Sequence, residues 1–255
     1  MIRKAQDHLK ILLLDIETSP NTAHVWGLYN QNVSLNQLME SSYVMCWAAK
    51  WLGEKEVFFS SIMENTHKQM IKKIYKLLEE ADAVIHYNGT KFDIPTLNKE
   101  FLLLGLTPPS PYREIDLLRT SRSKFKFPSN KLDYVAQALG LGEKVKHIGH
   151  ELWIRCMNKD KQAWDMMKKY NIQDVVLLEK VYEKMLSWIR NHPNHNGFTE
   201  GVVCPNCGSS NLIKRGLACN TNTVYQRLRC KSCGKWSRSN KQMKNLKKLQ
   251  SAISI

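Results

Sequence analysis

Three observations predict an α/β fold in which helices cover a mixed sheet, followed by a small C-terminal zinc module with four cysteines. Strand-like apolar segments fill much of residues 11–61, and helical and strand-like patterns then alternate up to residue 189. Two CxxC pairs lie beyond residue 200, where the composition becomes strongly basic. With 255 residues, the chain is long enough for a full hydrophobic core and for one or two domains.

The first predicted elements are strands. Residues 11–14 are aliphatic and run into the segment "DIETSP", so this strand ends before Pro20. β-rich segments at 22–29, 43–51 and 56–61 follow at short intervals. Their spacing predicts an antiparallel meander.

Helices and strands then alternate along the chain. Residues 67–82 carry apolar side chains at helical spacing, and 83–89 form a short apolar segment that ends at a turn signal. A helix at 95–105, a strand at 113–118 and further helices to about residue 189 complete the pattern. Together with the meander, this order predicts a mixed sheet covered by helices.

Charge divides the chain into two parts. The formal net charge is +15, but after residue 189 there are 12 Lys and Arg against one acid, Glu200, a net of +11. Residues 190–201 are polar and contain proline and glycine, which predicts a linker. We therefore expect an α/β domain at 1–189, a cysteine module at 202–240 and a basic amphipathic helix at 241–255.

The composition also indicates where the protein works. Since no stretch reaches membrane-spanning length and the N-terminus lacks the pattern of a cleaved leader, we expect a soluble cytoplasmic protein with no membrane partner. Seven cysteines are an odd number, and four of them form CxxC pairs. In a reducing compartment such pairs indicate a metal site rather than disulfides.

Two carboxylates follow the first strand. Asp15 and Glu17 are two residues apart, so their side chains point to the same face of the strand. Like charges about 6 to 7 Å apart repel each other, and a bound cation would turn this cost into affinity. The alternative is that the strand emerges into solvent at Asp15.

Two later segments carry acids at positions that suit the same site. Asp93 follows the carboxyl end of a strand, where α/β proteins bind ligands, although it could equally be the N-cap of a helix. Tyr170 and Asp174 are four residues apart on a predicted helix and therefore share one face. The alternative is a surface tyrosine next to a solvated aspartate.

The order of these motifs resembles the DEDDy 3′-5′ exonucleases of the ribonuclease H-like superfamily. The matching motifs are "DIETSP", "NGTKFD" and "YNIQD", and the resemblance covers residues 9–189. The segment that joins the last two motifs is similar to its counterpart in the proofreading domains of family B DNA polymerases. The sister subgroup has a histidine five residues before the last aspartate, where this chain has Lys169.

This resemblance implies a site with two Mg²⁺ or Mn²⁺ ions. It implies that Asp15 bridges both ions and that Glu17 and Asp174 complete the site that activates water. Asp93 would hold the second ion, and Tyr170 would orient the attacking water. Two such ions, about 4 Å apart, can activate water and neutralise charge on a phosphodiester. Carboxylates are suitable ligands because hard cations prefer oxygen.

Other residues of this domain have two interpretations. Asn88, Phe92 and Asp116 are candidates for shaping the substrate cleft, but they are also ordinary turn or core residues. His86, on an apolar strand, is expected to be a satisfied core histidine. The segment "SKFKFPS", 123–129, alternates basic and aromatic residues, as a single-strand-binding surface does. It could equally be an amphipathic loop anchored in the core by its two phenylalanines.

The two CxxC pairs predict one structural Zn²⁺ site. Cys204, Cys207, Cys230 and Cys233 have the spacing of a tetrahedral site around a small hairpin sheet. The segment resembles the zinc ribbons of transposases and other DNA-handling proteins. Cys219 is not expected to be a ligand. The remaining two cysteines, Cys46 and Cys156, are expected to be core residues.

The surface of the zinc ribbon is predicted to bind nucleic acid. Basic side chains interspersed with aromatic ones suit a phosphate backbone with stacked bases, and the alternative is a solvated basic face on a spacer module. The helix predicted at 241–255 could cap the ribbon, bind nucleic acid or dock a partner. The candidate contact residues are Lys214, Arg215, Arg227, Arg229, Lys231, Lys235, Trp236 and Arg238, with Tyr225 among them.

The sequence thus predicts a metal-dependent 3′-5′ exonuclease that hydrolyses single-stranded 3′ ends, with DNA favoured over RNA. Two alternatives stay open: an exoribonuclease, and a non-catalytic nucleic-acid-binding adaptor on a nuclease fold. The presence of all four acids and the tyrosine argues against the adaptor. The expected partners are nucleic acid and, as candidates, replication or repair proteins.

Overall fold

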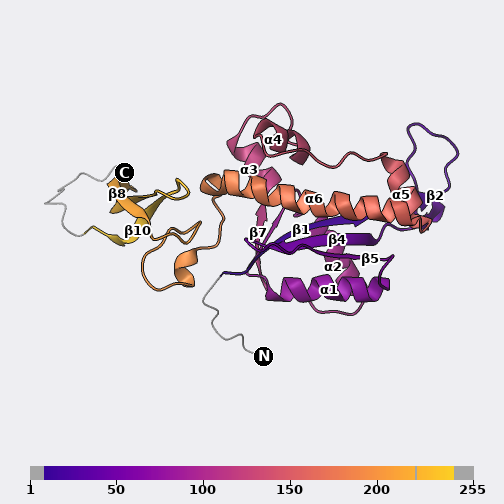
Figure 1. Ribbon diagram of the computed structural model, residues 1–255, viewed down its shortest axis with the longest axis horizontal. Helices are drawn as coiled ribbons and strands as arrows, with labels where there is room; N and C mark the ends of the chain where they lie inside the picture. The colour runs from indigo at the N-terminus through magenta and orange to yellow at the C-terminus, as the bar shows by residue number, and fades with distance from the viewer. Residues whose placement is uncertain (1–8, 222, 244–255) are drawn as a thin grey trace. The chain divides into compact units, whose positions relative to one another are not determined.

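A computed structural model describes residues 9–221 and 223–243 of the chain (Figure 1). The chain divides into two compact units, Lys10–Glu183 and a C-terminal unit that begins at Lys184. The domain boundaries expected from the charge distribution stay a prediction. The part of the predicted tail from residue 244 onward lies outside the described residues.

The first unit is built on a five-stranded mixed sheet with the order β5-β4-β1-β6-β7. The central strand β1 pairs antiparallel with β4 and parallel with β6, and β6 pairs parallel with β7. The sequence-based prediction of a mixed α/β fold is therefore confirmed. The strands are β1 (Ile11–Thr18), β4 (Val44–Trp51), β5 (Phe58–Ser61), β6 (Ala83–His86) and β7 (Arg113–Asp116).

Helices cover both faces of this sheet (Figure 1). Side chains of α1 and α2 contribute to the core on one face, and side chains of α5 and α6 contribute to the core on the other. None of the helices within residues 9–221 and 223–243 is long and apolar enough to cross a membrane. The helices are α1 (His67–Glu80), α2 (Asp93–Leu103), α3 (Leu117–Lys124), α4 (Leu132–Ala138), α5 (His150–Met157) and α6 (Lys161–Met185).

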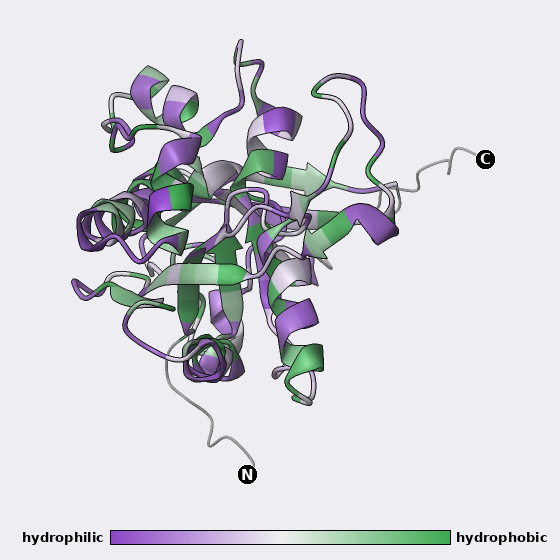
Figure 2. Ribbon diagram, turned by 90° about the vertical axis from the view of Figure 1, so that its right-hand side faces the viewer, coloured by the Kyte–Doolittle hydropathy of each residue, from purple (hydrophilic) through white to green (hydrophobic). Residues whose placement is uncertain are grey.

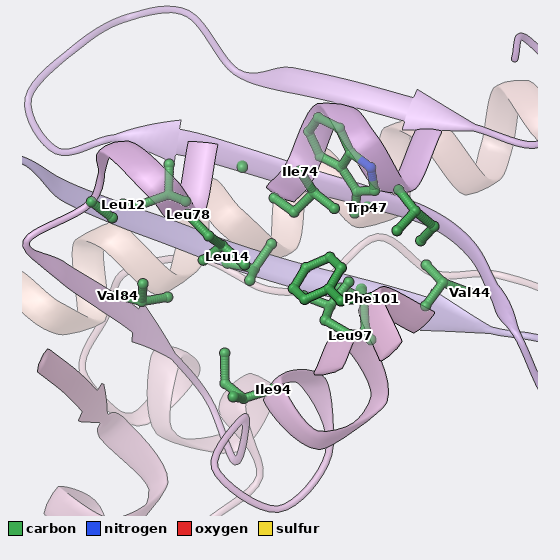
Figure 3. Close-up of a cluster of buried hydrophobic side chains, with 14 of the residues drawn as sticks. Leu12, Leu14, Val44, Trp47, Ile74, Leu78, Val84, Ile94, Leu97 and Phe101 are labelled. Carbon is green, nitrogen blue, oxygen red and sulfur yellow. The ribbon is translucent and has the colours of Figure 1, made fainter. Parts of the chain in front are cut away.

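The alternation of side chains along β1 decides where the acids point. Leu12, Leu14 and Ile16 pack into the core that β1 shares with α1 and α2 (Figure 3). Asp15 and Glu17 therefore face the other side of the sheet, where α6 lies. Figure 2 shows hydrophobic residues along the strands, as expected for a sheet covered on both faces.

The sequence-based prediction of a strand at 22–29 is wrong for most of that segment. Only β2 (Thr22–Ala23) is a strand, and it pairs with β3 (Leu38–Glu40) as a short separate hairpin. Residues 24–34 form its loop, followed by a 3-10 turn at Leu35–Gln37. The apolar residues of this loop form no strand, because β4 already pairs with the edge of β1 that they would need as a partner.

The C-terminal unit contains a three-stranded antiparallel sheet with the order β10-β9-β8. Its strands are β8 (Leu212–Cys219), β9 (Val224–Cys230) and β10 (Trp236–Gln242). The first CxxC segment is tied to the end of the preceding helical region by hydrogen bonds. The Asn206 amide donates to the carbonyl oxygens of Leu186 at 2.8 Å and Ile189 at 3.2 Å.

Candidate active site

Three of the four predicted acids meet at the carboxyl end of β1. Asp15 and Glu17 come from β1, and α6 brings Asp174 to the same face of the sheet. One carboxylate oxygen from each lies within 4.8 Å of those of the other two. Asp15 and Glu17 are partly exposed and Asp174 is buried, so the strand does not simply end in solvent.

Asp93 lies behind this cluster rather than in it. It is the first residue of α2, it is buried, and its Oδ1 accepts a hydrogen bond from the backbone N–H of Ile16 at 3.1 Å. This bond fixes the carboxylate beside the residue that separates Asp15 from Glu17. Phe92 occupies the N-cap position, so the interpretation of Asp93 as the helix N-cap is wrong.

Burial makes the ionised form of these acids costly. It raises the pKa of Asp15 well above its usual range, and repulsion from Glu17 and Asp93 raises it further. Burial also raises the pKa of Glu17 to about 8 and that of Asp93 to about 6. Such a cluster favours any ligand that supplies positive charge.

The donor set fits divalent metal ions. All four groups are hard oxygen ligands of the kind that Mg²⁺ and Mn²⁺ prefer. Among the described residues, Asp174 Oδ1 and Asn171 Oδ1 are buried without a hydrogen-bond partner. A buried carboxylate oxygen without a partner is unfavourable unless a cation or a water binds it.

The sequence-based interpretation missed Lys144. Its ammonium group forms an ion pair with Asp174 and donates a hydrogen bond to the hydroxyl of Tyr170 at 3.2 Å. Its backbone N–H donates to Asp133 Oδ1 at 2.8 Å, which fixes the loop that carries it. Burial lowers the pKa of Lys144, but attraction by Asp174 and Tyr170 outweighs this effect, so the lysine stays charged. It lies 30 residues before Asp174 in a segment with no periodicity that could have marked it.

A second missed residue is Asn171. It is fully buried, and its amide donates to Asp15 Oδ2 at 2.7 Å. This bond holds the Asp15 carboxylate in place and links β1 to α6. A signal was available, because Asn171 is three residues before Asp174 on the same helix face.

Tyr170 is a buried residue of the site. Its side chain is 9% exposed and its ring packs edge-on against His147, with ring centroids 4.8 Å apart, and against Trp153. The interpretation of Tyr170 and Asp174 as a solvated surface pair is therefore wrong. Burial and the charge of Asp174 raise the pKa of Tyr170 above its usual value, so the hydroxyl stays neutral.

A cavity of about 590 Å³ opens beside the acids. Asp15 and Lys144 line it, and two further basic side chains, Arg122 and Lys131, lie on its wall. A cavity with a carboxylate at one point and cations elsewhere can bind a phosphate backbone next to a metal site. Its other lining residues are Tyr87, Leu118, Ser129, Asn130, Leu132 and Asp133.

The residues after β6 form a turn whose backbone is fixed by a positive φ angle and a hydrogen bond. Asn88 has a positive φ of 73° and its N–H donates to Asp116 Oδ1 at 3.0 Å. The same carboxylate caps α3 by accepting from the N–H of Leu118 at 2.9 Å. In the described structure Asn88 and Asp116 are thus turn and cap residues, whereas Phe92 is 43% exposed and available to a ligand.

His86 is a satisfied core histidine, as predicted. Its Nδ1 accepts from the N–H of Gly89 at 3.0 Å, and its Nε2 faces a carboxylate oxygen of Glu114 at 3.3 Å. A Cβ on Gly89 would lie 2.4 Å from the His86 ring, so only glycine fits there. In the segment 123–129 the two phenylalanine rings are half-buried, 5.6 Å apart.

The four predicted zinc ligands come together in the C-terminal unit. Their sulfur atoms lie within 4.8 Å of one another, with 3.6 Å between Cys204 and Cys233 and 3.7 Å between Cys207 and Cys230. A tetrahedral zinc site with Zn–S bonds of about 2.3 Å separates its sulfurs by about 3.8 Å. The set therefore fits one zinc ion. As predicted, Cys219 is outside the cluster and exposed, and two cysteines are buried core residues: Cys46 and Cys156.

One face of the β9-β10 ribbon carries arginines stacked on aromatic rings. Arg227 and Arg229 lie 5.9 and 5.6 Å from the ring centre of Trp236, and Arg238 lies 3.8 Å from that of Tyr225. The Lys235 ammonium donates to the carbonyl oxygen of Ile189 at 2.6 Å, so it also serves the packing of this unit. The remaining predicted contact residues are at least partly exposed: Lys214, Arg215 and Lys231.

Comparison with known proteins agrees with this geometry. The family model of the RNase_H superfamily matches residues 12–186. The chain belongs to the RNase_H superfamily. This assignment confirms the fold class predicted from the motifs.

Two polymerases are similar to this RNase_H superfamily protein. A DNA polymerase of Pyrococcus glycovorans is 25% identical over 203 residues, which cover 67% of this chain and 24% of the polymerase. The structure of the family B DNA polymerase from the hyperthermophilic archaeon Pyrobaculum calidifontis matches with a TM-score of 0.53 and 20% identity, over 71% of this chain and 25% of that one. The chain thus spans about a quarter of the length of each. The superfamily and the acid cluster support a nuclease that acts on nucleic acid.

Proposed function

We propose that this protein is a 3′-5′ exonuclease that removes nucleotides from single-stranded 3′ ends, with DNA as the favoured substrate. The observation that carries the proposal is the meeting of Asp15, Glu17 and Asp174 within 4.8 Å, with Tyr170 and Lys144 against them. The direction of hydrolysis and the preference for DNA come from the resemblance of the motifs to the DEDDy exonucleases. The similarity to two DNA polymerases supports the same substrate class.

Two divalent ions would complete the site. Asp15, Glu17 and Asp174 would hold one ion, and the resemblance to the DEDDy exonucleases implies that Asp15 and Asp93 would hold the other. When bound, Mg²⁺ or Mn²⁺ would supply an activated water and neutralise charge on the phosphoryl oxygens. The residues of the chain then have three tasks: to hold these ions, to orient the water and to position the strand.

In the proposed mechanism, Tyr170 and Lys144 would contact the reacting atoms without being metal ligands. Because Tyr170 stays neutral, its hydroxyl can accept from Lys144 while donating to, or accepting from, a water. Lys144 stays charged and lines the cavity, so it can stabilise negative charge that develops on the phosphate. Arg122 and Lys131 on the cavity wall would hold the neighbouring phosphates.

The decisive test is hydrolysis by the purified full chain in Mg²⁺. The substrates are end-labelled single-stranded DNA, duplex DNA and RNA, each with a free or a blocked 3′ end. We expect stepwise loss of nucleotides from the free 3′ end of single-stranded DNA and none from the blocked end. Faster loss from RNA would favour the exoribonuclease, internal cuts an endonuclease, and tight binding without cleavage in Mg²⁺ or Mn²⁺ the adaptor.

We also propose that the zinc ribbon binds the strand through its basic face. The test compares binding of Asp15→Asn and of the same variant ended at Asn191 to one oligonucleotide over a salt series in Ca²⁺. Each phosphate contact adds about 0.7 to the slope of log affinity against log salt for a single strand. On the order of four contacts would therefore steepen the slope of the full chain by about 3. Equal slopes would instead indicate a protein-docking module.

A further inference from the structure

An aromatic hairpin projects from the first unit. It consists of β2, β3 and the loop between them, residues 22–40. Trp26 is 99% exposed and Tyr29 is 84% exposed, although both are among the largest side chains in proteins. Monomeric proteins rarely expose contiguous apolar patches larger than a few hundred Å², and two such rings alone present about that area. The other exposed apolar residues of the hairpin are Val25, Leu28, Val33, Leu35 and Met39.

The hairpin carries amides in place of charges. There is no Asp, Glu, Lys or Arg from Thr18 to Met39, in a chain of which 24% is charged. Asparagine and glutamine side chains combine donors and acceptors, as the edges of nucleobases do. Residues 22–39 carry no carboxylate that would repel a phosphate backbone, and Glu40, at the end of β3, is the one acid of the hairpin. Its polar side chains include Asn21, Asn30, Gln31, Asn32, Asn36 and Gln37.

The hairpin follows β1, the strand that carries Asp15 and Glu17. Beyond the end of β1, the N–H of Ser19 still donates to the carbonyl oxygen of Tyr43 at 2.9 Å. Near the loop, the N–H of His24 donates to the carbonyl oxygen of Gln37 at 2.9 Å. The chain advances six residues from Glu17 to Ala23, which spans at most about 20 Å. Trp26 and Tyr29 follow Glu17 by 9 and 12 residues, so the chain that connects them to the acids spans at most about 30 to 40 Å.

We propose that the aromatic hairpin binds the bases of the single strand several nucleotides upstream of the one being removed, with Trp26 and Tyr29 stacked on them. This inference rests on the proposed function. The cavity beside the acids offers cations for phosphates, and the hairpin offers rings and amides for bases. Exposed apolar residues are also typical of protein interfaces. However, the hairpin directly follows the β-strand that carries Asp15 and Glu17, which favours the nucleic-acid substrate of that site as its ligand.

The experiment separates contacts with bases from contacts with phosphates. The full-length Asp15→Asn protein in Ca²⁺ is titrated into a 5′-labelled 12-mer and into a matched 12-mer with abasic sites everywhere except its last two 3′ nucleotides, with fluorescence anisotropy as the readout. Trp26→Ala and Tyr29→Ala are compared with Trp26→Phe, which keeps a ring, and with Trp26→Leu, which is apolar without one. Leu102→Ala, which removes an exposed apolar side chain of α2, is the control.

We expect Trp26→Ala to weaken binding of the normal strand by about 5- to 100-fold and to change binding of the abasic strand by less than about twofold. Trp26→Phe should keep most of the wild-type affinity for the normal strand. Trp26→Leu should bind that strand as weakly as Trp26→Ala does. A three-nucleotide strand should bind wild type and variant alike, because it is too short to reach the hairpin.

Three results would overturn the inference. Unchanged binding of the normal strand by Trp26→Ala would mean that the hairpin has another occupant, such as a protein. Equal weakening on both strands would mean a structural role. If the wild type still cleaves in Mg²⁺, these two results remove this inference alone. A wild-type chain that neither binds nor cleaves any strand removes the proposed function and this inference together.

Discussion

The acid cluster of the first unit and the cysteine cluster of the second both have donor sets that fit metal ions, but they are built in opposite ways. The four sulfur atoms surround one point, with pairs 3.6 and 3.7 Å apart, and leave no open position. Among the acids of the cluster, Asp15 lines a cavity of about 590 Å³, and burial disfavours the ionised forms of Asp15 and Glu17. We therefore expect metal to complete the fold in one arrangement and to stay accessible to a substrate in the other.

Because of this difference, we expect the two metals to affect different properties of the protein. The sheet of the first unit has a hydrophobic core on each face, so we expect it to fold without a cation. The ribbon offers fewer buried apolar residues, because the side chains of its strands are half-buried or exposed except at Cys230. Removal of zinc should therefore unfold a domain, whereas removal of magnesium should stop a reaction.

The largest expected effect is the loss of the ribbon fold in Cys230→Ser. A structural zinc site contributes on the order of 10 kcal/mol to folding, which a ribbon of this size cannot replace. We expect zinc content to fall from one ion to none and the melting transition of the ribbon to disappear. The rate of hydrolysis at saturating substrate should stay within about twofold, and loss of the nuclease fold would show that the two units fold together.

Asp15→Asn should abolish hydrolysis, with a loss of about 10³-fold or more, because Asp15 is the acid shared by both proposed ions. The free energy of unfolding without added metal should be unchanged or slightly higher. The reason is that the variant relieves repulsion with Glu17 and Asp93 while an amide oxygen can still accept from Asn171. Melts with and without Mg²⁺ check this. A marked loss of stability in the metal-free variant would make Asp15 a structural residue.

Lys144→Met should separate metal binding from catalysis. The ammonium now neutralises Asp174, so its removal should strengthen Mg²⁺ binding several-fold. Turnover should fall by about 10²-fold, because the positive charge beside the phosphate is lost. Isothermal titration with Mg²⁺ and single-turnover hydrolysis measure the two effects. Weaker metal binding together with slower turnover would instead show that Lys144 only holds the site in shape.

The smallest effect is expected for Tyr170→Phe. In the proposed mechanism the hydroxyl orients water without holding metal, so its loss should slow hydrolysis by about 10- to 100-fold and leave Mg²⁺ binding unchanged. The ring still packs against His147 and Trp153, which keeps the fold intact. Single-turnover rates across a Mg²⁺ series provide the measurement. A variant as active as the wild type would remove Tyr170 from the mechanism.

The sequence by itself determined the parts of this protein that depend on short-range periodicity. Two residues of spacing on a strand put Asp15 and Glu17 on one face, and four residues on a helix put Tyr170 beside Asp174. The two CxxC pairs likewise specified the cysteine cluster. In each case the geometry follows from the local backbone, so no knowledge of distant segments was needed.

Only the tertiary structure decided which distant residues complete the site. Lys144 meets Asp174 because the loop after α4 folds back over α6, and no local pattern encodes that contact. Residues 24–29 have the composition of a strand, yet they remain part of a loop because β4 already pairs with the edge of β1. A strand requires a partner as well as a propensity, and the partner is chosen by the whole sheet.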